Sequence, residues 1–138
     1  MEETGYKIGQ TAEFSKTITE TDVYTFAGIT GDFNPLHVDA ERAKSLPFGQ
    51  RIVHGMLTAS FISTVIASKM PGPGTIYIKQ TLSFIKPVYF NDTITAKVTI
   101  IEIGAKRHAR LNTTVINQQG ETVVSGEALV KLPKGGGN

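Results

Sequence analysis

Residues 55–69 constrain the fold of this chain more than any other stretch. They contain no acidic residue, their one basic residue is the final Lys69, and a helix built from them has apolar side chains on nearly every side: Met56, Leu57, Phe61, Ile62, Val65 and Ile66. A helix of this kind is buried in a core. Its length of about 22 Å, at about 1.5 Å per residue, is enough to cross a sheet.

Beyond a break at residues 71–74, apolar residues recur with a period of two, which is typical of strands with one buried face. Four segments show this alternation: Ile76, Ile78, Leu82 and Phe84; Ile94, Ala96, Val98 and Ile100; Ala109, Leu111, Thr113 and Val115; Val124, Ala128, Val130 and Leu132. Turn-forming residues separate the segments, and residues 117–120 resemble a short hairpin loop. We therefore expect an antiparallel meander.

The first part of the chain predicts one more strand and two short helices. Residues 10–17 alternate as a half-buried strand does. Thr19 can then cap a helix, which we expect to end at Gly31. Asp39 offers a second cap, for a short polar helix over residues 40–44.

One strand, helices and then four strands leave one clear way to bury the apolar helix, which is to wrap the sheet around it. The expected class is α+β, with an antiparallel five-stranded sheet around a central apolar helix. The length suits a single domain over residues 1–138, with residues 134–138 as a loose tail. Such a sheet has open edges, and a homodimer is the simplest way to cover them.

Composition excludes several classes of function. Cysteine is absent, so disulfides, a thiolate nucleophile and a sulfur-based zinc site are unavailable. His37, His54 and His108 show no metal-ligand spacing, and we expect no metal. The net charge is +2 with scattered basic residues, which predicts no nucleic-acid partner. No stretch resembles a secretory signal or a membrane span, so we expect a cytoplasmic protein without a membrane partner.

The residues whose side chains are best suited to catalysis are Asp32, Asn34 and His37. Pro35 fixes one φ and biases Asn34 away from helical geometry, so this turn can hold polar side chains in place. Carboxylate and imidazole are the groups most used for proton transfer, because their pKa values are easily moved toward working pH. Two interpretations stay open: a catalytic pair, or an ordinary turn in which His37 bonds to a backbone carbonyl.

The order and spacing of these motifs resemble the MaoC-like (R)-specific enoyl-CoA hydratases. DFNPLH at residues 32–37, RIVHGM at 51–56 and the strand segment at 76–84 carry the likeness, which covers nearly the full chain. It is nearest to the short, single-domain members that supply (R)-3-hydroxyacyl-CoA for polyhydroxyalkanoate synthesis. The resemblance implies the hot dog fold and the reversible hydration of a trans-2-enoyl-CoA to (3R)-hydroxyacyl-CoA, without a cofactor.

The resemblance also implies roles for residues of the motif. Asp32 and His37 would hold one water and deliver its oxygen to C3 and a proton to C2 of the enoyl thioester, with Asn34 in support. The developing negative charge lies on the thioester oxygen. The backbone N–H of Gly55 would stabilise it, since a helix N-terminus supplies a free N–H and a positive dipole. Glycine would also let the substrate approach closely.

Residues further along the apolar helix carry weaker expectations. Ser63 matches a serine that lines the catalytic cavity in similar hydratases, and the alternative is a serine bonded to its own helix. Ile66 and Leu129 are the expected walls of the acyl pocket. We interpret His54 as a structural cap or a hydrogen-bonded turn residue rather than a proton donor.

Two other functions compete with hydration. The hot dog fold also hosts acyl-CoA thioesterases, because a fold does not fix a function. Similar thioesterases commonly present a carboxylate from the central helix, and residues 55–68 offer none. A non-catalytic acyl-binding module is the other alternative, and the intact Asp32, Asn34 and His37 argue against it.

Overall fold

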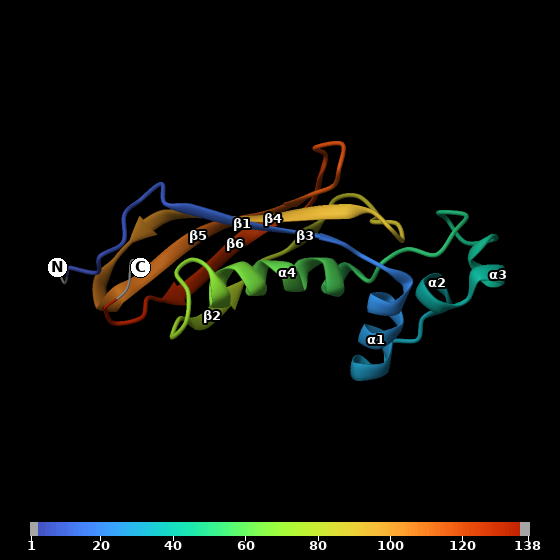
Figure 1. The fold of residues 1–138 in the computed structure, drawn as a ribbon, viewed down its shortest axis with the longest axis horizontal. Coiled ribbons are helices and arrows are strands. Elements are labelled where there is room, and N and C mark those ends of the chain that lie inside the picture. Colours follow the sequence, from blue (N-terminus) through green and yellow to red (C-terminus); the bar gives the residue numbers. More distant parts are fainter. Residues whose placement is uncertain (1–2, 136–138) are drawn as a thin grey trace.

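The computed structural model describes residues 3–135. In chain order its elements are β1 (Thr11–Thr17), α1 (Glu20–Thr30), α2 (Pro35–Val38), α3 (Ala40–Ala43), α4 (Gly55–Ser68), β2 (Ile76–Gln80), β3 (Ser83–Phe84), β4 (Thr93–Ile103), the 3-10 turn η1 (Ala105–Arg107), β5 (His108–Ile116) and β6 (Thr122–Lys131). Figure 1 shows an elongated sheet with α4 along it and α1, α2 and α3 gathered at one end. No helix among these residues is both long and apolar enough to cross a membrane.

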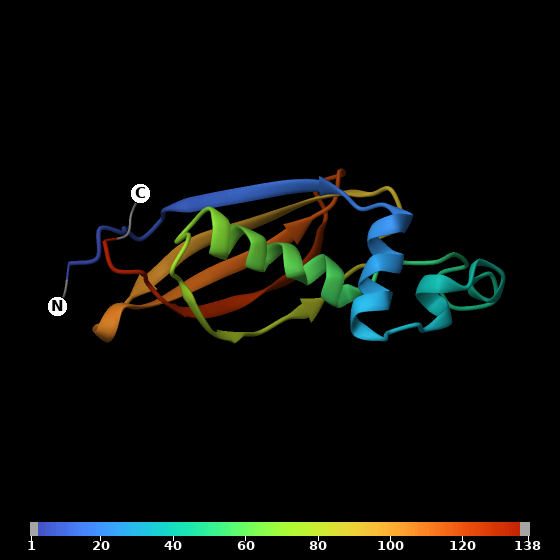
Figure 2. The ribbon, with the colours of Figure 1, turned by 60° about the horizontal axis from the view of Figure 1, so that its bottom comes forward.

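The strands form one antiparallel sheet in the order β1-β4-β5-β6-β2, and the short β3 also pairs with β6. Figure 2 shows α4 lying across one face of this sheet, between β1 and β2. The prediction of an antiparallel sheet around a central apolar helix is confirmed. The described sheet has six strands where five were expected, because the first predicted meander strand is two strands.

The core lies between α4 and the inner face of the sheet. The alternation predicted for β4, β5 and β6 is confirmed, since all twelve inward positions are at most 2% exposed. One of the twelve, Thr113, is polar, and Asn117 just after β5 is a further buried polar residue. Burying one large aliphatic side chain is worth about 1.5–3 kcal/mol, so this interface holds the fold together. The helix contributes its buried apolar residues, Leu57, Phe61, Ile62, Val65 and Ile66.

The predicted strand over residues 76–84 is wrong in one respect, because it breaks at Thr81. The Thr81 N–H donates to the Glu127 carbonyl oxygen at 2.9 Å, which carries the backbone directly over Gly126. A Cβ at Gly126 would lie 1.8 Å from the Thr81 carbonyl oxygen, so only glycine fits. A register shift in β2 changes the side-chain parity as well. Ile76, Ile78 and Phe84, which the alternation placed on one buried face, are 57%, 48% and 53% exposed.

The N-terminal elements follow their sequence signals closely. Thr19 caps α1 through a capping box with Asp22, in which each side chain accepts the other residue's N–H at 3.1 and 2.9 Å. The predicted end at Gly31 is confirmed. Asp39 caps α3 by accepting the Arg42 N–H at 3.0 Å, as expected. These caps fix where each short helix begins and ends.

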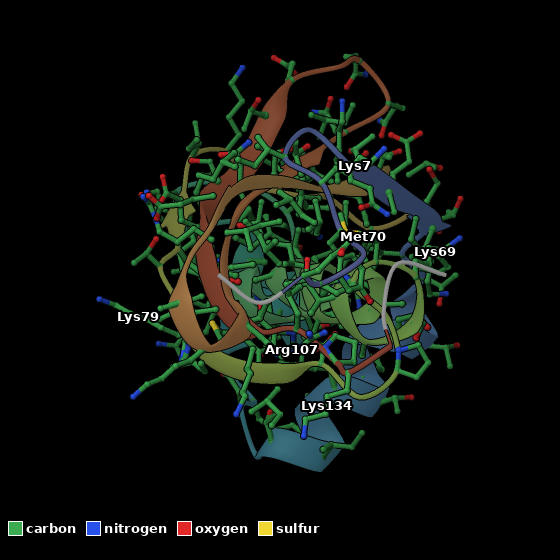
Figure 3. The ribbon with its side chains drawn as sticks, turned by 90° about the vertical axis from the view of Figure 1, so that its left-hand side faces the viewer. Lys7, Lys69, Met70, Lys79, Arg107 and Lys134 are labelled. Carbon is green, nitrogen blue, oxygen red and sulfur yellow. The ribbon has the colours of Figure 1, made fainter. Side chains whose placement is uncertain are left out.

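Figure 3 views the end of the molecule opposite to α1, α2 and α3. Lys7, Lys69, Lys79 and Lys134 lie at separate places around this end, in keeping with the scattered basic residues of the sequence. Arg107 is buried and donates to the backbone carbonyls of Leu132 and Pro133, which ties η1 to the chain after β6. Of the predicted loose tail, residues 136–138 lie outside the described residues.

A steric prediction follows from the close approach at Gly126. Gly126→Ala will lower the free energy of unfolding by about 2 kcal/mol or more, because backbone must move to admit the methyl group. Gly28→Ala is the matched control, since an added Cβ in α1 meets nothing within 4 Å. It will raise stability by about 0.5–1 kcal/mol through helix propensity. Urea unfolding of both variants measures this, and a neutral Gly126→Ala would contradict the account of the break.

Candidate active site

Asp32 lies in the turn that ends α1. Gly31 adopts a left-handed conformation with φ of 81° and donates its N–H to the Ala27 carbonyl oxygen at 2.8 Å. The Asp32 N–H then donates to Thr30 Oγ1 at 3.2 Å, and Asp32 Oδ1 accepts the N–H of Asn34 at 3.3 Å. The carboxylate is therefore held at the helix exit while its side chain stays exposed.

Asn34 shapes the next helix. Its backbone is extended (φ −53°, ψ 129°), as predicted for a residue before proline. Its Oδ1 accepts the Leu36 N–H at 3.1 Å, so Asn34 is the N-cap of α2, with Pro35 in the first turn. Asn34 is absent from the lining of the main cavity among the described residues. Its observed action on the site is to orient α2, which carries His37.

His37 is buried and fixed in one tautomer. Its Nδ1 lies 2.8 Å from the Ile52 carbonyl oxygen. A carbonyl can only accept, so Nδ1 carries the proton and Nε2 of the neutral ring is left as an acceptor. The Ile52 N–H returns a bond to the Leu36 carbonyl oxygen at 3.0 Å. The bond to a backbone carbonyl, one of the two interpretations of His37, is therefore present. It uses one ring nitrogen, so the catalytic interpretation stays a prediction for the other.

His54 lies against His37 at the start of α4. The two rings stack with centroids 3.9 Å apart and planes at 25°, and Phe26 of α1 packs on His54 at 4.9 Å. His54 occupies the N-cap position, as predicted, but its side chain caps nothing. Instead its Nε2 donates to the Asp32 carbonyl oxygen at 3.0 Å. Burial lowers the pKa of His54, and the neighbouring His37 acts in the same direction.

Arg51 ties the segment before α4 to α1. It pairs with Glu20 at 2.6 Å, and its guanidinium lies 4.6 Å from the centre of the Phe90 ring and donates to the Tyr24 hydroxyl. Next along the chain, the Val53 N–H donates to the Val88 carbonyl oxygen at 2.8 Å. The residues that carry the site are thus held from α1, α2 and the strand region at once.

These elements border a cavity of about 490 Å³ at the N-terminal end of α4, where Figure 2 shows α1 beside α4 and α2 beyond α1. Asp32, His37, His54 and Gly55 form its polar side. The remaining walls are mainly apolar and include Leu36, Phe48, Met56, Phe84, Ile85 and Val88. A mostly apolar cavity with a few convergent polar groups is typical of a small-molecule site.

Gly55 is the first residue of α4, so its N–H has no intrahelical acceptor. The space left by its missing side chain is filled by the ring of Phe84, because a Cβ at Gly55 would lie 2.8 Å from Phe84 Cδ1 and Cε1. In this structure the glycine therefore admits an aromatic ring, where sequence analysis expected close approach of a substrate. Phe84 comes from β3, the strand that the sequence did not distinguish.

The structure places Asp32, His37 and Gly55 around one cavity, as the sequence analysis grouped them. It does not bring Ser63, Ile66 and Leu129 there, for they are absent from the cavity lining within residues 3–135. Ser63 is exposed on α4, Ile66 is buried in the core, and Leu129 is half-buried on β6. Sequence reasoning missed Phe48, Met56 and Phe84 as cavity walls, because their side chains converge only through the tertiary fold.

Asp32, His37 and His54 also meet one condition for a metal site, since one ligand atom from each lies within 4.8 Å of the others. Three such residues could bind a transition metal. The imidazole rings stack with planes at 25°, however, and each ring already gives one nitrogen to a backbone carbonyl. This geometry favours a hydrogen-bonding group, and the expectation of no metal stays a prediction.

A sheet wrapped around one apolar helix, with a carboxylate and an imidazole at the N-terminus of that helix, defines a hot dog protein with a polar site in an apolar cavity. The comparisons assign the family: residues 3–124 match the model of the MaoC like domain, and the chain belongs to this family.

Named relatives share most of the chain's length. It is 44% identical over 130 residues to an (R)-specific enoyl-CoA hydratase of Rhodospirillum rubrum, covering 94% of this chain and 90% of the relative. It is 46% identical over 129 residues to a 3-hydroxybutyryl-CoA dehydratase of Methylorubrum extorquens, covering 93% and 82%. The solved (R)-hydratase of Aeromonas caviae, described as involved in PHA biosynthesis, superposes with a TM-score of 0.90 at 43% identity, covering 93% and 98%.

The burial of His54 predicts a pH dependence of stability. Because the folded state lowers the pKa of His54 below its ordinary value of 6.5, the unfolded chain binds this proton more readily. The contribution of His54 to the free energy of unfolding is therefore fully present above about pH 6.5 and is lost as the pH falls below this value. The loss is at most about 1.4 kcal/mol per pH unit, the limit for one proton.

Urea unfolding of the wild type and of His54→Gln at pH 7.5 and 5.5 checks this pH dependence. The variant will lose less stability on acidification than the wild type. His108→Gln serves as the control, because His108 is only half-buried at the surface of β5. An equal loss in His54→Gln and wild type would contradict the prediction.

Proposed function

We propose that the chain is an (R)-specific enoyl-CoA hydratase, a hydro-lyase that adds water to trans-2-enoyl-CoA and also catalyses the reverse dehydration. The observation that carries the proposal is the pairing of Asp32 and His37 at the polar side of an apolar cavity, beside the N-terminus of α4. Relatives with 43–46% identity over most of the chain, named as hydratases and a dehydratase, support the same reaction.

The distance between Asp32 and His37 suits one shared water. An oxygen of Asp32 and a nitrogen of His37 lie within 4.8 Å of one another. Two hydrogen bonds of about 2.8 Å that meet at a tetrahedral angle span about 4.6 Å. The Asp32 carboxylate and the His37 Nε2 are both acceptors, and a water has two protons to donate. One water can therefore bridge the pair with a lone pair directed at the substrate.

Atoms and protons balance with this single water. The water oxygen bonds to C3 of the enoyl thioester as one of its protons passes to the Asp32–His37 pair. The pair then delivers a proton to C2, so hydroxyl and hydrogen add to the same face of the double bond. Negative charge builds on the thioester oxygen in between. The N–H of Gly55 at the positive end of α4 is the group that we assign to stabilise it.

The acyl chain finds its apolar surroundings within the same cavity. We place it against the walls formed by Leu36, Met56 and Phe84. The earlier candidates Ile66 and Leu129 for the acyl pocket, and Ser63 for the catalytic cavity, lie outside this lining and stay predictions. The CoA moiety extends from the open side. A thioesterase is disfavoured because α4 presents no carboxylate at this position.

Crotonyl-CoA distinguishes the candidate functions in one assay that follows enoyl absorbance and free thiol together. Hydration removes the enoyl absorbance without releasing thiol, and this is the expected result. Thiol release would indicate a thioesterase, and binding without either change would indicate an acyl-binding module. An (R)-specific 3-hydroxyacyl-CoA dehydrogenase should oxidise the product, whereas oxidation by the (S)-specific enzyme alone would overturn the stereochemical assignment.

Asp32 and His37 should behave as one unit, because either substitution loses the bridging water. Asp32→Asn and His37→Gln will each lower kcat by about 10²-fold to 10⁴-fold with little change in KM. The double variant will fall scarcely further. Steady-state hydration of crotonyl-CoA measures these values, and thermal unfolding controls for the fold. Multiplied losses in the double variant would show independent roles instead.

We further propose a homodimer that covers the β2 edge of the sheet. β2 is an edge strand with unpaired backbone groups along one side. Ile76, Tyr77 and Ile78 on β2, together with the nearby Phe84 and Ile85, are all exposed at 39% or more. An edge strand flanked by exposed apolar side chains matches a self-complementary interface between two copies. The cavity shares Phe84 and Ile85, so a partner would border the site.

Charge on the β2 face should separate the two copies. The double variant Ile76→Lys/Ile78→Lys will elute as a monomer at micromolar concentration, because two lysines would face two others across the interface. Ile101→Lys on β4 is the matched control, since β4 lies toward the opposite side of the sheet. Light scattering coupled to size exclusion gives the mass. A wild type that is an active monomer would contradict the proposed dimer.

The setting of the reaction is also a proposal. We propose that the protein is cytoplasmic and supplies (R)-3-hydroxyacyl-CoA for polyhydroxyalkanoate synthesis. The support is the similarity to the Aeromonas caviae hydratase, which is described as involved in PHA biosynthesis.

A further inference from the structure

We propose that His54 is a positioning residue that fixes where Asp32 and His37 lie relative to one another. This inference rests on the proposed hydratase function. The sequence suggested a structural cap or a hydrogen-bonded turn residue at this position. In the structure His54 is 1% exposed and touches both members of the catalytic pair through different parts of its ring. Each contact fixes one member.

The first contact fixes the main chain at Asp32. His54 Nε2 lies 3.0 Å from the Asp32 carbonyl oxygen, so Nε2 carries the proton of the neutral ring. Asp32 stands in an exposed turn between α1 and α2 and is 22 positions away from His54 in sequence. This bond therefore joins the turn that carries the carboxylate directly to the start of α4, where Gly55 lies.

The second contact fixes the ring of His37. Its edge is held by the bond from Nδ1 to the Ile52 carbonyl oxygen, and its face is covered by the stacked His54 ring at 3.9 Å. A hydrogen bond alone leaves an imidazole free to rotate about it, whereas a bond and a stack together define the plane. The direction of the His37 Nε2 lone pair is thus set by His54.

The choice of residue at this position supports a role other than capping. Serine, threonine, aspartate and asparagine are preferred at an N-cap, and replacing such a cap costs about 1 kcal/mol. His54 stands at the N-cap without capping, and its Nδ1 is buried with no hydrogen-bond partner among the described residues. An unsatisfied buried acceptor has a free-energy cost as well. The contacts of His54 to Asp32 and His37 are the favourable interactions that accompany this free-energy cost.

Two further features of the site act on the His54 ring, namely the packing of Phe26 and the electrostatic surroundings. Phe26 of α1 also packs on the His54 ring, with ring centroids 4.9 Å apart, so side chains of both α1 and α2 contact this ring. The titratable groups that face His54 are His37 and Asp32, and burial together with His37 lowers the pKa of His54. Burial and the neighbouring imidazole thus both disfavour the charged form of the His54 ring.

Two variants separate the two contacts. His54→Phe keeps a flat ring against His37 and removes the donor to Asp32, whereas His54→Gln keeps a donor of similar reach and removes the stack. Val23→Ala is the control for lost stability, because Val23 is buried in α1 away from the cavity lining. We expect each His54 variant to lower kcat for crotonyl-CoA by about 10-fold to 100-fold with KM within about threefold, since small misplacements carry losses of this size.

Coupling and tautomers give readouts that a merely structural role would not change. His54→Gln added to His37→Gln will lower kcat no further than His37→Gln alone, because the stack that His54→Gln removes acts through His37. In addition, ¹⁵N shifts of the imidazoles at pH 7.5 will show His54 protonated at Nε2 and His37 at Nδ1. Val23→Ala will lower the melting temperature and leave kcat unchanged.

The outcomes separate the inference from the function beneath it. If the wild type does not hydrate crotonyl-CoA, the proposed function fails and the role of His54 fails with it. If the wild type hydrates and both His54 variants keep kcat within about twofold, only the positioning role is overturned. The same conclusion follows from His54 protonated at Nδ1, or from losses that multiply in the double variant.

Discussion

The burial of α4 against the sheet is the interaction on which the rest of the structure depends. The helix crosses the inner faces of β4, β5 and β6, and apolar side chains on both sides are almost fully removed from water. This packing fixes the axis of α4 and hence the position of its N-terminus. A helix N-terminus presents free N–H groups and a positive potential at one defined place. The hydrophobic core thus determines where an electron-rich substrate atom can be stabilised.

A second set of contacts brings Asp32 and His37 to that place. The residues just before α4 bond to α2 through Ile52, to the strand region through Val53 and to the turn after α1 through His54. Asp32 lies in an exposed turn, and His37 lies on the four-residue helix α2. Their positions therefore depend on hydrogen bonds to the residues just before α4. Because α4 is packed in the core, the core fixes the geometry of the site.

Much of the fold could be predicted because its signals are local. Alternation in β4, β5 and β6 and the caps at Thr19 and Asp39 each depend on residues close in sequence, and the grouping of Asp32 with His37 rests on a short spacing. The break at Thr81 could not be predicted, because it arises from contact with Gly126, 45 positions along the chain. The stacking of His54 on His37 and the packing of Phe84 on Gly55 likewise join residues with no periodic relation.

The ring of Phe84 has a consequence for how the site is reached. It fills the volume beside the first N–H of α4, yet it is 53% exposed and belongs to β3, next to the apolar face of β2. The same side chain is thus part of the inner wall of the cavity and part of the outer surface of the molecule. Whatever covers that surface limits the rotamers open to the ring. A contact made at this edge of the sheet and access to the backbone of Gly55 therefore both depend on the conformation of the Phe84 side chain.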